Sequence, residues 1–160
     1  RVVADSLGDA TGTGCLGSAA VDVLAELAGD PLIRATCLPW LAEPQPHQAR
    51  VRMAALRTLL LNLVGNARHH GAGAVDIDVR PWTVRIHNEL KEPLSGAALQ
   101  DYLDYLNGRA EPPAFPFGSG LRDVREKLPW ATEPPSQLEI RASLPGEGVL
   151  DVVLAWRGLR

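Results

Sequence analysis

The chain has few cysteines, few aromatic residues and little net charge. Cys15 and Cys37 are its two cysteines, and without metal-ligand spacing they exclude a disulfide scaffold and a cysteine-based zinc site. A net charge of −3 disfavours non-specific binding to nucleic acid. The apolar runs fall short of the roughly 20 residues that span a bilayer. The hydrophobic content of 46% suits one globular domain, which we expect to be cytoplasmic, with a membrane anchor possible elsewhere in the full-length protein.

A glycine motif near the start imitates a dinucleotide-binding fingerprint. Residues 12–17 fit G-x-G-x-x-G and precede a helical pattern. A dinucleotide fold needs a strand that runs directly into the first glycine and an acidic residue after the next strand, and the sequence has neither. We therefore interpret residues 1–15 as a flexible linker from a preceding domain and residues 16–160 as the domain itself.

Hydrophobic periodicity predicts alternating helices and strands. We expect helices at 18–28, 51–70, 97–106 and 118–128, and strands at 32–38, 75–79, 82–86, 138–142 and 149–155. In the first helix the expected inward residues are Ala20, Val21, Leu24, Leu27 and Ala28. Gly71 is expected to cap the second helix. The order of elements predicts an α/β two-layer sandwich, with a mostly antiparallel mixed sheet covered by helices on one face.

The helix expected at 51–70 carries two different faces. Its apolar face consists of Met53, Leu56, Leu60, Leu63 and Ala67. Asn62, Asn66 and the pair His69-His70 follow one another at i, i+4 and i+7/i+8 and form a polar line. Asparagine is a poor helix former, so two of them one turn apart indicate a specific role. An amide oxygen can ligate a hard cation, and an amide NH2 can donate to a phosphate.

Two stretches resemble a known family. Residues 62–71, N-L-V-G-N-A-R-H-H-G, resemble the N box of the histidine-kinase-type ATP-binding domain, whose superfamily includes gyrase and MutL. Residues 118–128, G-S-G-L-R-D-V-R-E-K-L, are similar to the glycine box of sensor kinases, and the order and spacing of the two boxes agree. The resemblance covers roughly residues 21–154. It implies a Bergerat-type ATPase fold that binds ATP and Mg2+.

The resemblance also implies roles for individual residues. Nucleotide contacts are expected from Asn62, Asn66, Arg68, His69, His70, Asn88, Gly118, Ser119, Gly120 and Leu121. Asn66 is the expected Mg2+ ligand, and the glycines at a helix N-terminus are expected to let phosphate come close. His69 is a catalytic candidate that would hold phosphate charge, with help from Arg68. Asn62, the other catalytic candidate, cannot act as a general base, which favours a kinase over a hydrolase.

The first glycine box departs from the family pattern. The family has Asp-x-Gly-x-Gly, in which the aspartate accepts a hydrogen bond from the adenine amino group. Residues 88–92 read Asn-Glu-Leu-Lys-Glu, so both glycines are missing. Asn88 can still accept through its side-chain oxygen, although a neutral acceptor makes a weaker bond than an ionised one.

Two interpretations remain open. The first is the catalytic domain of a two-component sensor histidine kinase, which donates the γ-phosphoryl group of ATP to a histidine. The sequence has no His-Glu or His-Asp pair, so that histidine is expected on a separate dimerisation domain of the same protein. A response regulator and a homodimeric full-length protein are then the expected partners. The second is a degenerate domain of the same fold that lacks nucleotide and serves as a docking or phosphotransfer scaffold.

Overall fold

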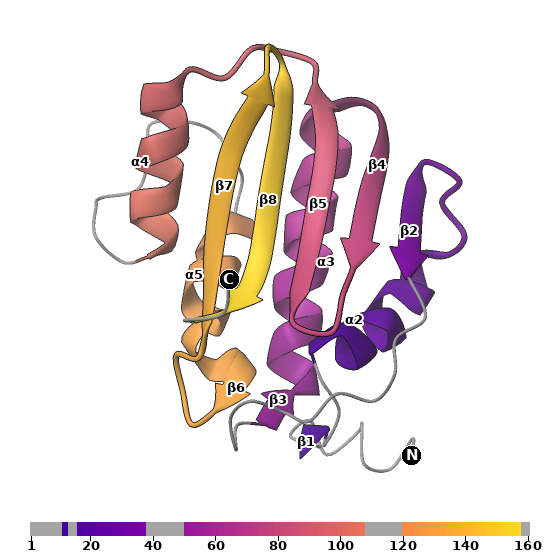
Figure 1. Ribbon diagram of the computed structural model, residues 1–160, viewed down its shortest axis with the longest axis vertical. Coiled ribbons are helices and arrows are strands. Elements are labelled where there is room, and N and C mark those ends of the chain that lie inside the picture. The colour runs from indigo at the N-terminus through magenta and orange to yellow at the C-terminus, as the bar shows by residue number, and fades with distance from the viewer. Residues whose placement is uncertain (1–10, 13–15, 38–49, 108–119, 158–160) are drawn as a thin grey trace.

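The computed structural model describes residues 11–12, 16–37, 50–107 and 120–157. In this part of the chain a five-stranded sheet carries its helices on one face, which confirms the predicted two-layer sandwich (Figure 1). In chain order the elements are β1 (Thr11–Gly12), α2 (Leu16–Leu24), η1 (Ala25–Leu27), β2 (Ile33–Cys37), β3 (Arg50–Arg52), α3 (Met53–His70), β4 (Gly71–Val79), β5 (Thr83–Leu90), α4 (Gly96–Leu106), α5 (Gly120–Lys127), η2 (Pro129–Ala131), β6 (Thr132–Glu133), β7 (Leu138–Gly146) and β8 (Val149–Trp156). None of the described helices is long and apolar enough to cross a membrane.

The strands of the large sheet lie in the order β2-β4-β5-β8-β7. β2 runs parallel to β4, and the other neighbouring pairs are antiparallel. The parallel pair is possible because the chain passes through the long helix α3 between the two strands, and parallel strands need such a crossover connection. The sheet is therefore mixed and mostly antiparallel, as predicted.

A second, three-stranded sheet of order β1-β3-β6 lies near the start of α3, and the sequence did not predict it. β3 takes residues 50–52, so α3 begins at Met53 rather than at Val51. Of the predicted linker, the structure describes Thr11 and Gly12, which pair with β3. Strands of two or three residues are too short to show a hydrophobic alternation, so periodicity could not reveal them.

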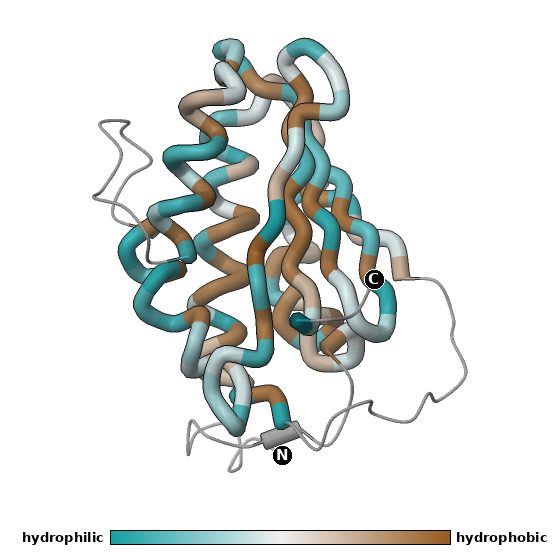
Figure 2. The backbone as a smooth tube through the Cα atoms, turned by 60° about the vertical axis from the view of Figure 1, so that its left-hand side comes forward, coloured by the Kyte–Doolittle hydropathy of each residue, from teal (hydrophilic) through white to brown (hydrophobic). Residues whose placement is uncertain are grey.

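α3 is the central helix of the helical layer. Its buried side chains are Leu56, Leu59, Leu60, Leu63, Val64 and Ala67. They include most of the predicted apolar face, whose first member, Met53, is half-buried. Figure 2 shows hydrophobic residues concentrated where the helices meet the sheet. Full burial of one leucine stabilises a fold by about 1.5–3 kcal/mol, so α3 contributes a large part of the core.

The first helix differs from the prediction in length and in two residues of its expected buried face. α2 ends at Leu24 and continues as a 3-10 turn over Ala25–Leu27. Val21, expected to point inward, is 38% exposed, whereas Val23 is 2% exposed. Ala28, also expected inward, is exposed. Ala20 and Leu24 are buried, as predicted. A 3-10 turn has about three residues per turn, so the 3.6-residue period does not extend beyond Leu24 to Ala28.

Several other elements extend beyond their predicted bounds. β5 continues past the predicted end at Ile86 to Leu90, so Asn88 lies inside the strand rather than after it. α4 begins at Gly96, where the Ser95 hydroxyl accepts from the backbone N–H of Ala98 at 3.1 Å. The predicted start of the next helix at residues 118–119 lies outside the described residues.

Gly71 joins α3 directly to β4. It caps α3 as predicted, but its backbone is extended, with φ −83°, so a left-handed conformation is not why glycine is needed. A Cβ atom here would lie 2.4 Å from the carbonyl oxygen of Ala67 and 3.2 Å from Nδ2 of Asn88. The absence of a side chain therefore lets β4 begin against the last turn of α3 and beside β5.

The face of the sheet opposite the helices carries paired charges. Arg34 on β2 and Asp76 on β4 form an exposed ion pair with an N–O distance of 2.7 Å. Asp151 on β8 is 4% exposed and bonds to both Arg85 and His87 of β5. Burial acts to raise the pKa of Asp151, but the hydrogen bonds and charges of Arg85 and His87 outweigh burial and hold that pKa below its usual value.

Replacing Asp151 with asparagine should lower the free energy of unfolding by about 2 kcal/mol at neutral pH, because hydrogen bonds to a buried charge are lost. A depressed folded-state pKa means that the ionised carboxylate stabilises fully above the unfolded pKa of about 3.9. That stabilisation is lost as the pH falls through the folded-state value. Denaturant titrations at a series of pH values should therefore show the wild type and the variant converging in acid.

The control is Asp76→Asn, which removes a carboxylate from an exposed pair on the same face of the sheet. An exposed ion pair contributes less than about 1 kcal/mol, so this variant should stay close to the wild type. Equal destabilisation by the two substitutions, or a loss in Asp151→Asn that does not change with pH, would contradict the role assigned to Asp151.

Candidate functional site

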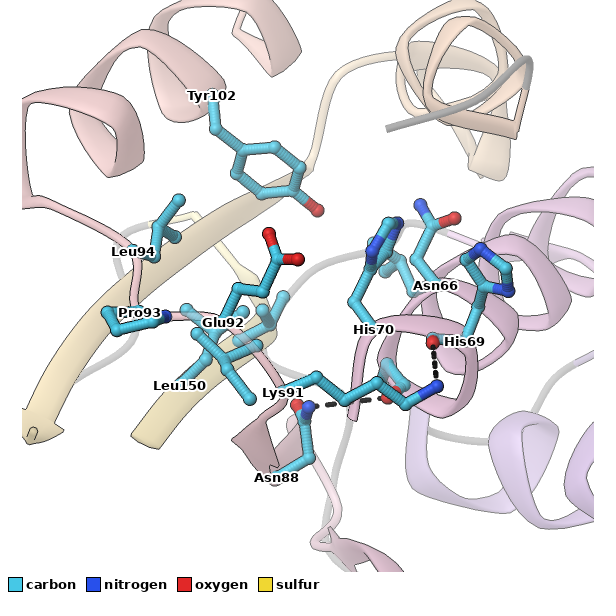
Figure 3. Close-up of a pocket in the computed structure, with 14 residues that line it drawn as sticks. Asn66, His69, His70, Asn88, Lys91, Glu92, Pro93, Leu94, Tyr102 and Leu150 are labelled. Atoms are coloured by element: carbon cyan, nitrogen blue, oxygen red, sulfur yellow. Dashed lines mark hydrogen bonds between the residues drawn. The ribbon is translucent and has the colours of Figure 1, made fainter. Parts of the chain in front are cut away.

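A cavity of about 410 Å³ opens between the end of α3, the inner face of the sheet and α4 (Figure 3). Side chains from α3, β5, the segment after β5, α4 and β8 contribute to its wall. The lining residues are Leu63, Asn66, Ala67, His69, His70, Asn88, Leu90, Lys91, Glu92, Pro93, Leu94, Tyr102, Leu150 and Val152. Most of the wall is apolar, and polar groups gather near the end of α3. A cavity of this size and composition is typical of a small-molecule site.

Asn88 provides an acceptor inside this cavity. Its neighbour His87 pairs with Asp151 on the outer face of the sheet, so strand alternation turns Asn88 inward, where it is 2% exposed. The side-chain Nδ2 donates to the carbonyl oxygens of Ala67 and Glu89, each at 3.3 Å. The side-chain Oδ1 is buried and has no hydrogen-bond partner among the described residues. Because the amide nitrogen is held by two carbonyls, the oxygen is the group of Asn88 that is left for a further hydrogen bond.

Asn66 provides a second unpaired group one residue before the Ala67 carbonyl that holds Asn88. Its Nδ2 is buried and has no partner within the described part of the chain. A buried polar atom without a partner costs about 1–3 kcal/mol, and folded proteins contain few of them. Asn66 and Asn88 therefore each leave hydrogen-bonding capacity unused beside this cavity.

Two histidines and a lysine stand at the polar end of the cavity. The rings of His69 and His70 meet edge to face, with centroids 4.8 Å apart. Burial, together with the charges of His69 and Lys91, lowers the pKa of His70, and the carboxylate of Glu92 opposes this only in part. His70 is therefore a neutral imidazole at neutral pH. The ammonium of Lys91 donates to the His69 carbonyl at 3.2 Å.

Apolar side chains form the rest of the wall. Leu63 of α3 and Leu150 and Val152 of β8 lie on the core side, and Leu94 lies in the segment before α4. Tyr102 of α4 adds an aromatic ring, and burial raises the pKa of its hydroxyl well above the usual value. Tyr102 thus stays protonated at neutral pH. This part of the cavity suits an apolar group.

The structure brings together Asn66, His69, His70 and Asn88 of the predicted site. Asn62 does not belong to the described lining. Its Nδ2 donates to the Thr58 carbonyl of its own helix at 2.8 Å. The nucleotide contact expected of Asn62 stays a prediction that this position does not favour.

The other predicted residues lie elsewhere or cannot be placed. Arg68 faces a different groove and pairs with Asp30 at 3.0 Å, which disfavours its expected contact with phosphate. Leu121 is buried in α5. Gly120 is the first residue of that helix. Gly118 and Ser119 lie outside the described residues, so their expected contacts with phosphate stay predictions.

Sequence reasoning missed several residues of the cavity. Lys91 and Glu92 occupy the degenerate first glycine box, whose family pattern predicts glycines and gives no role to charged side chains. Tyr102 of α4 is buried and lines the cavity, but sequence alone could not connect α4 with the end of α3. A longer predicted strand would have indicated these residues, because β5 continues past Asn88 and leads the chain along the cavity wall.

No protein-family model and no curated protein sequence matches this chain. Solved structures match it over most of its length. The histidine kinase domain of the E. coli osmosensor EnvZ has a TM-score of 0.55 and 15% identity, covering 92% of this chain and 89% of that one. The catalytic domain of histidine kinase ThkA has a TM-score of 0.54 and 16% identity, covering 92% of this chain and 95% of that one.

The cytoplasmic segment of histidine kinase QseC also matches, with a TM-score of 0.54 and 10% identity, over 91% of this chain and 77% of that one. At sequence identities this low, the structural similarity shows a shared fold and does not show shared chemistry. The mixed five-stranded sheet with helices on one face agrees with these matches. The chain therefore has the fold of the catalytic, ATP-binding domain of histidine kinases.

Proposed function

We propose that this domain binds Mg2+-ATP and donates the γ-phosphoryl group to a histidine on a separate dimerisation domain, as the catalytic domain of a sensor histidine kinase. The observation that carries the proposal is the pair of unpaired amide atoms, Oδ1 of Asn88 and Nδ2 of Asn66, in a largely apolar cavity. The fold of histidine-kinase catalytic domains supports it.

Asn88 is the proposed reader of the base. Its unpaired oxygen would accept from the exocyclic amino group of adenine, whereas guanine carries a carbonyl oxygen at the equivalent ring position. Two acceptors facing each other cannot form a hydrogen bond, and both would then be buried without partners. The apolar wall formed by Leu63, Leu150 and Tyr102 would pack against the faces of the base.

Asn66 is the proposed ligand of Mg2+ through its amide oxygen. No group of three His, Cys, Asp or Glu side chains that could hold a metal occurs among the described residues. One amide oxygen is nevertheless sufficient, since Mg2+ keeps several waters and takes phosphate oxygens as ligands. When bound, the ion would neutralise charge on the phosphates. The unpaired Nδ2 of Asn66 would donate to a phosphate or to a metal-bound water.

The domain's own side chains would bind and orient ATP rather than activate a nucleophile. Asn62 has no useful basicity, and helix α3 contains no Asp or Glu. The helix therefore offers no general base that could activate water for the hydrolysis of ATP. Phosphoryl transfer depends mostly on positioning and on neutralising charge, which these residues can supply. In this proposal the acceptor histidine belongs to the dimerisation domain of the same protein, which acts as a homodimer, and a response regulator receives the phosphoryl group.

One observation favours the alternative, a domain that docks a partner without nucleotide. Leu90 and Glu92 stand where the family has glycines, and Glu92 adds a negative charge to the wall of the cavity. A carboxylate repels phosphate, so it opposes binding of a nucleotide. Direct titration with nucleotide decides between the two functions, because the docking module would bind neither ATP nor ADP.

The first test concerns Asn66 and Mg2+. Titration calorimetry should show that Mg2+ tightens ADP binding to the wild type by about tenfold, roughly 1.4 kcal/mol. Asn66→Ala should remove most of that gain, because the variant lacks the amide oxygen. Asn62→Ala, an equal truncation one turn earlier on α3, should keep it. The assignment of Asn66 is wrong if its variant responds to Mg2+ as the wild type does.

The second test concerns Asn88 and the choice of base. The wild type should bind ADP at least about tenfold more tightly than GDP, since the Asn88 oxygen needs a donor. Asn88→Leu should abolish this preference and weaken ADP. The matched control is Asn62→Leu, an identical change at an amide outside the described lining. Equal ADP-to-GDP ratios for the wild type and Asn88→Leu would mean that Asn88 does not contact the base.

A further inference from the structure

Lys91 lies where the cavity meets the C-terminal end of α3. Its backbone N–H donates to the carbonyl of His70 at 3.0 Å, and its side-chain Nζ donates to the carbonyl of His69 at 3.2 Å. Figure 3 shows the ammonium group against the last turn of the helix, while the carboxylate of Glu92 is turned toward Tyr102. The positive charge is therefore held at the polar end of the cavity, beside the two histidines.

Other basic side chains near α3 are engaged elsewhere or lose their charge. Arg68 pairs with Asp30 at 3.0 Å and lines a second groove, which His69 and Lys91 border as well. Arg125 of α5 stacks on the ring of Tyr105, 4.7 Å from its centroid. Burial lowers the pKa of His70. Among the described residues that line the cavity, Lys91 is the side chain with a permanent positive charge.

A polyphosphate at this position would meet unfavourable charges. The C-terminal end of a helix carries the negative end of its dipole, and the last residues of α3 line the cavity. Glu92 contributes a full negative charge to the same wall. An ammonium group that caps the helix end offsets the first of these effects directly. It has three donors, so the bond to the His69 carbonyl leaves two for phosphate oxygens.

We propose that Lys91 anchors the phosphates of the nucleotide in this cavity, in place of a basic residue on α3. The inference rests on the proposed function and adds a binding residue to it. The family's glycines leave room for the nucleotide to approach the backbone. In this chain, residues 90–92 instead supply the positive side chain of Lys91. The altered box would thus keep a role in nucleotide binding by different chemistry.

Calorimetric titrations with adenosine and with ADP separate the phosphates from the base. Lys91→Gln should weaken ADP by about tenfold, because it removes a charge-assisted bond, and should leave adenosine within about twofold. Lys91→Arg should recover most of the ADP affinity. The wild-type affinity for ADP should also fall with added salt more steeply than that of Lys91→Gln. The matched control, Arg68→Gln, removes a cation that is paired with Asp30 and lies outside the described lining of the cavity, so it should affect neither ligand.

A purely structural role for Lys91 predicts a different pattern, because loss of a helix cap would weaken adenosine and ADP by the same factor. That result would overturn the inference while leaving the proposed function in place. So would an unchanged ADP affinity in Lys91→Gln, or a loss of ADP affinity in Arg68→Gln equal to that in Lys91→Gln. If the wild type binds adenosine and ADP equally well, the phosphates are not recognised and the inference is again wrong. If it binds neither, the proposed function fails, and the inference fails with it.

Discussion

The C-terminal end of α3 is held by residues of β5 and of the segment that follows, and the cavity depends on this junction. The carbonyl of Ala67 accepts from Asn88, and those of His69 and His70 accept from the side chain and backbone of Lys91. Gly71 permits the close approach, since any Cβ there would overlap the Ala67 carbonyl. Helix carbonyls that would otherwise lack partners are thus satisfied by residues that line the cavity.

This junction explains how one helix serves both the core and the site. Leucines on one side of α3 bury themselves against the sheet, and Asn66, one turn from the end, is carried to the cavity by the same rigid element. Two constraints orient Asn88: strand alternation turns its side chain inward, and two carbonyls bind its amide nitrogen. Side chains fixed in this way can select a ligand at little entropic cost, because their geometry exists before binding.

Sequence predicted the parts of the structure that rest on local pattern. The leucine period located α3, and alternation located β4 and β5, so the sandwich followed. The same helical period placed Asn66 on a polar line, apart from the apolar face. Sequence could not show that Arg68 would turn to Asp30, because that choice depends on where η1 and β2 pack. It also could not show that Asn62 would bond to Thr58, or that Lys91 would reach the end of α3. These contacts depend on tertiary placement.

The central claim is that the amides of Asn66 and Asn88 complete their hydrogen bonds with an adenine nucleotide. The most direct measurement follows the side-chain NH2 signals of 15N-labelled protein by NMR during a titration with ADP and Mg2+. The account predicts saturable shifts for Asn66, whose NH2 gains a partner, and for Asn88, whose oxygen does, while Asn62 stays unchanged. Signals of Asn66 and Asn88 that remain fixed at saturating nucleotide would contradict it.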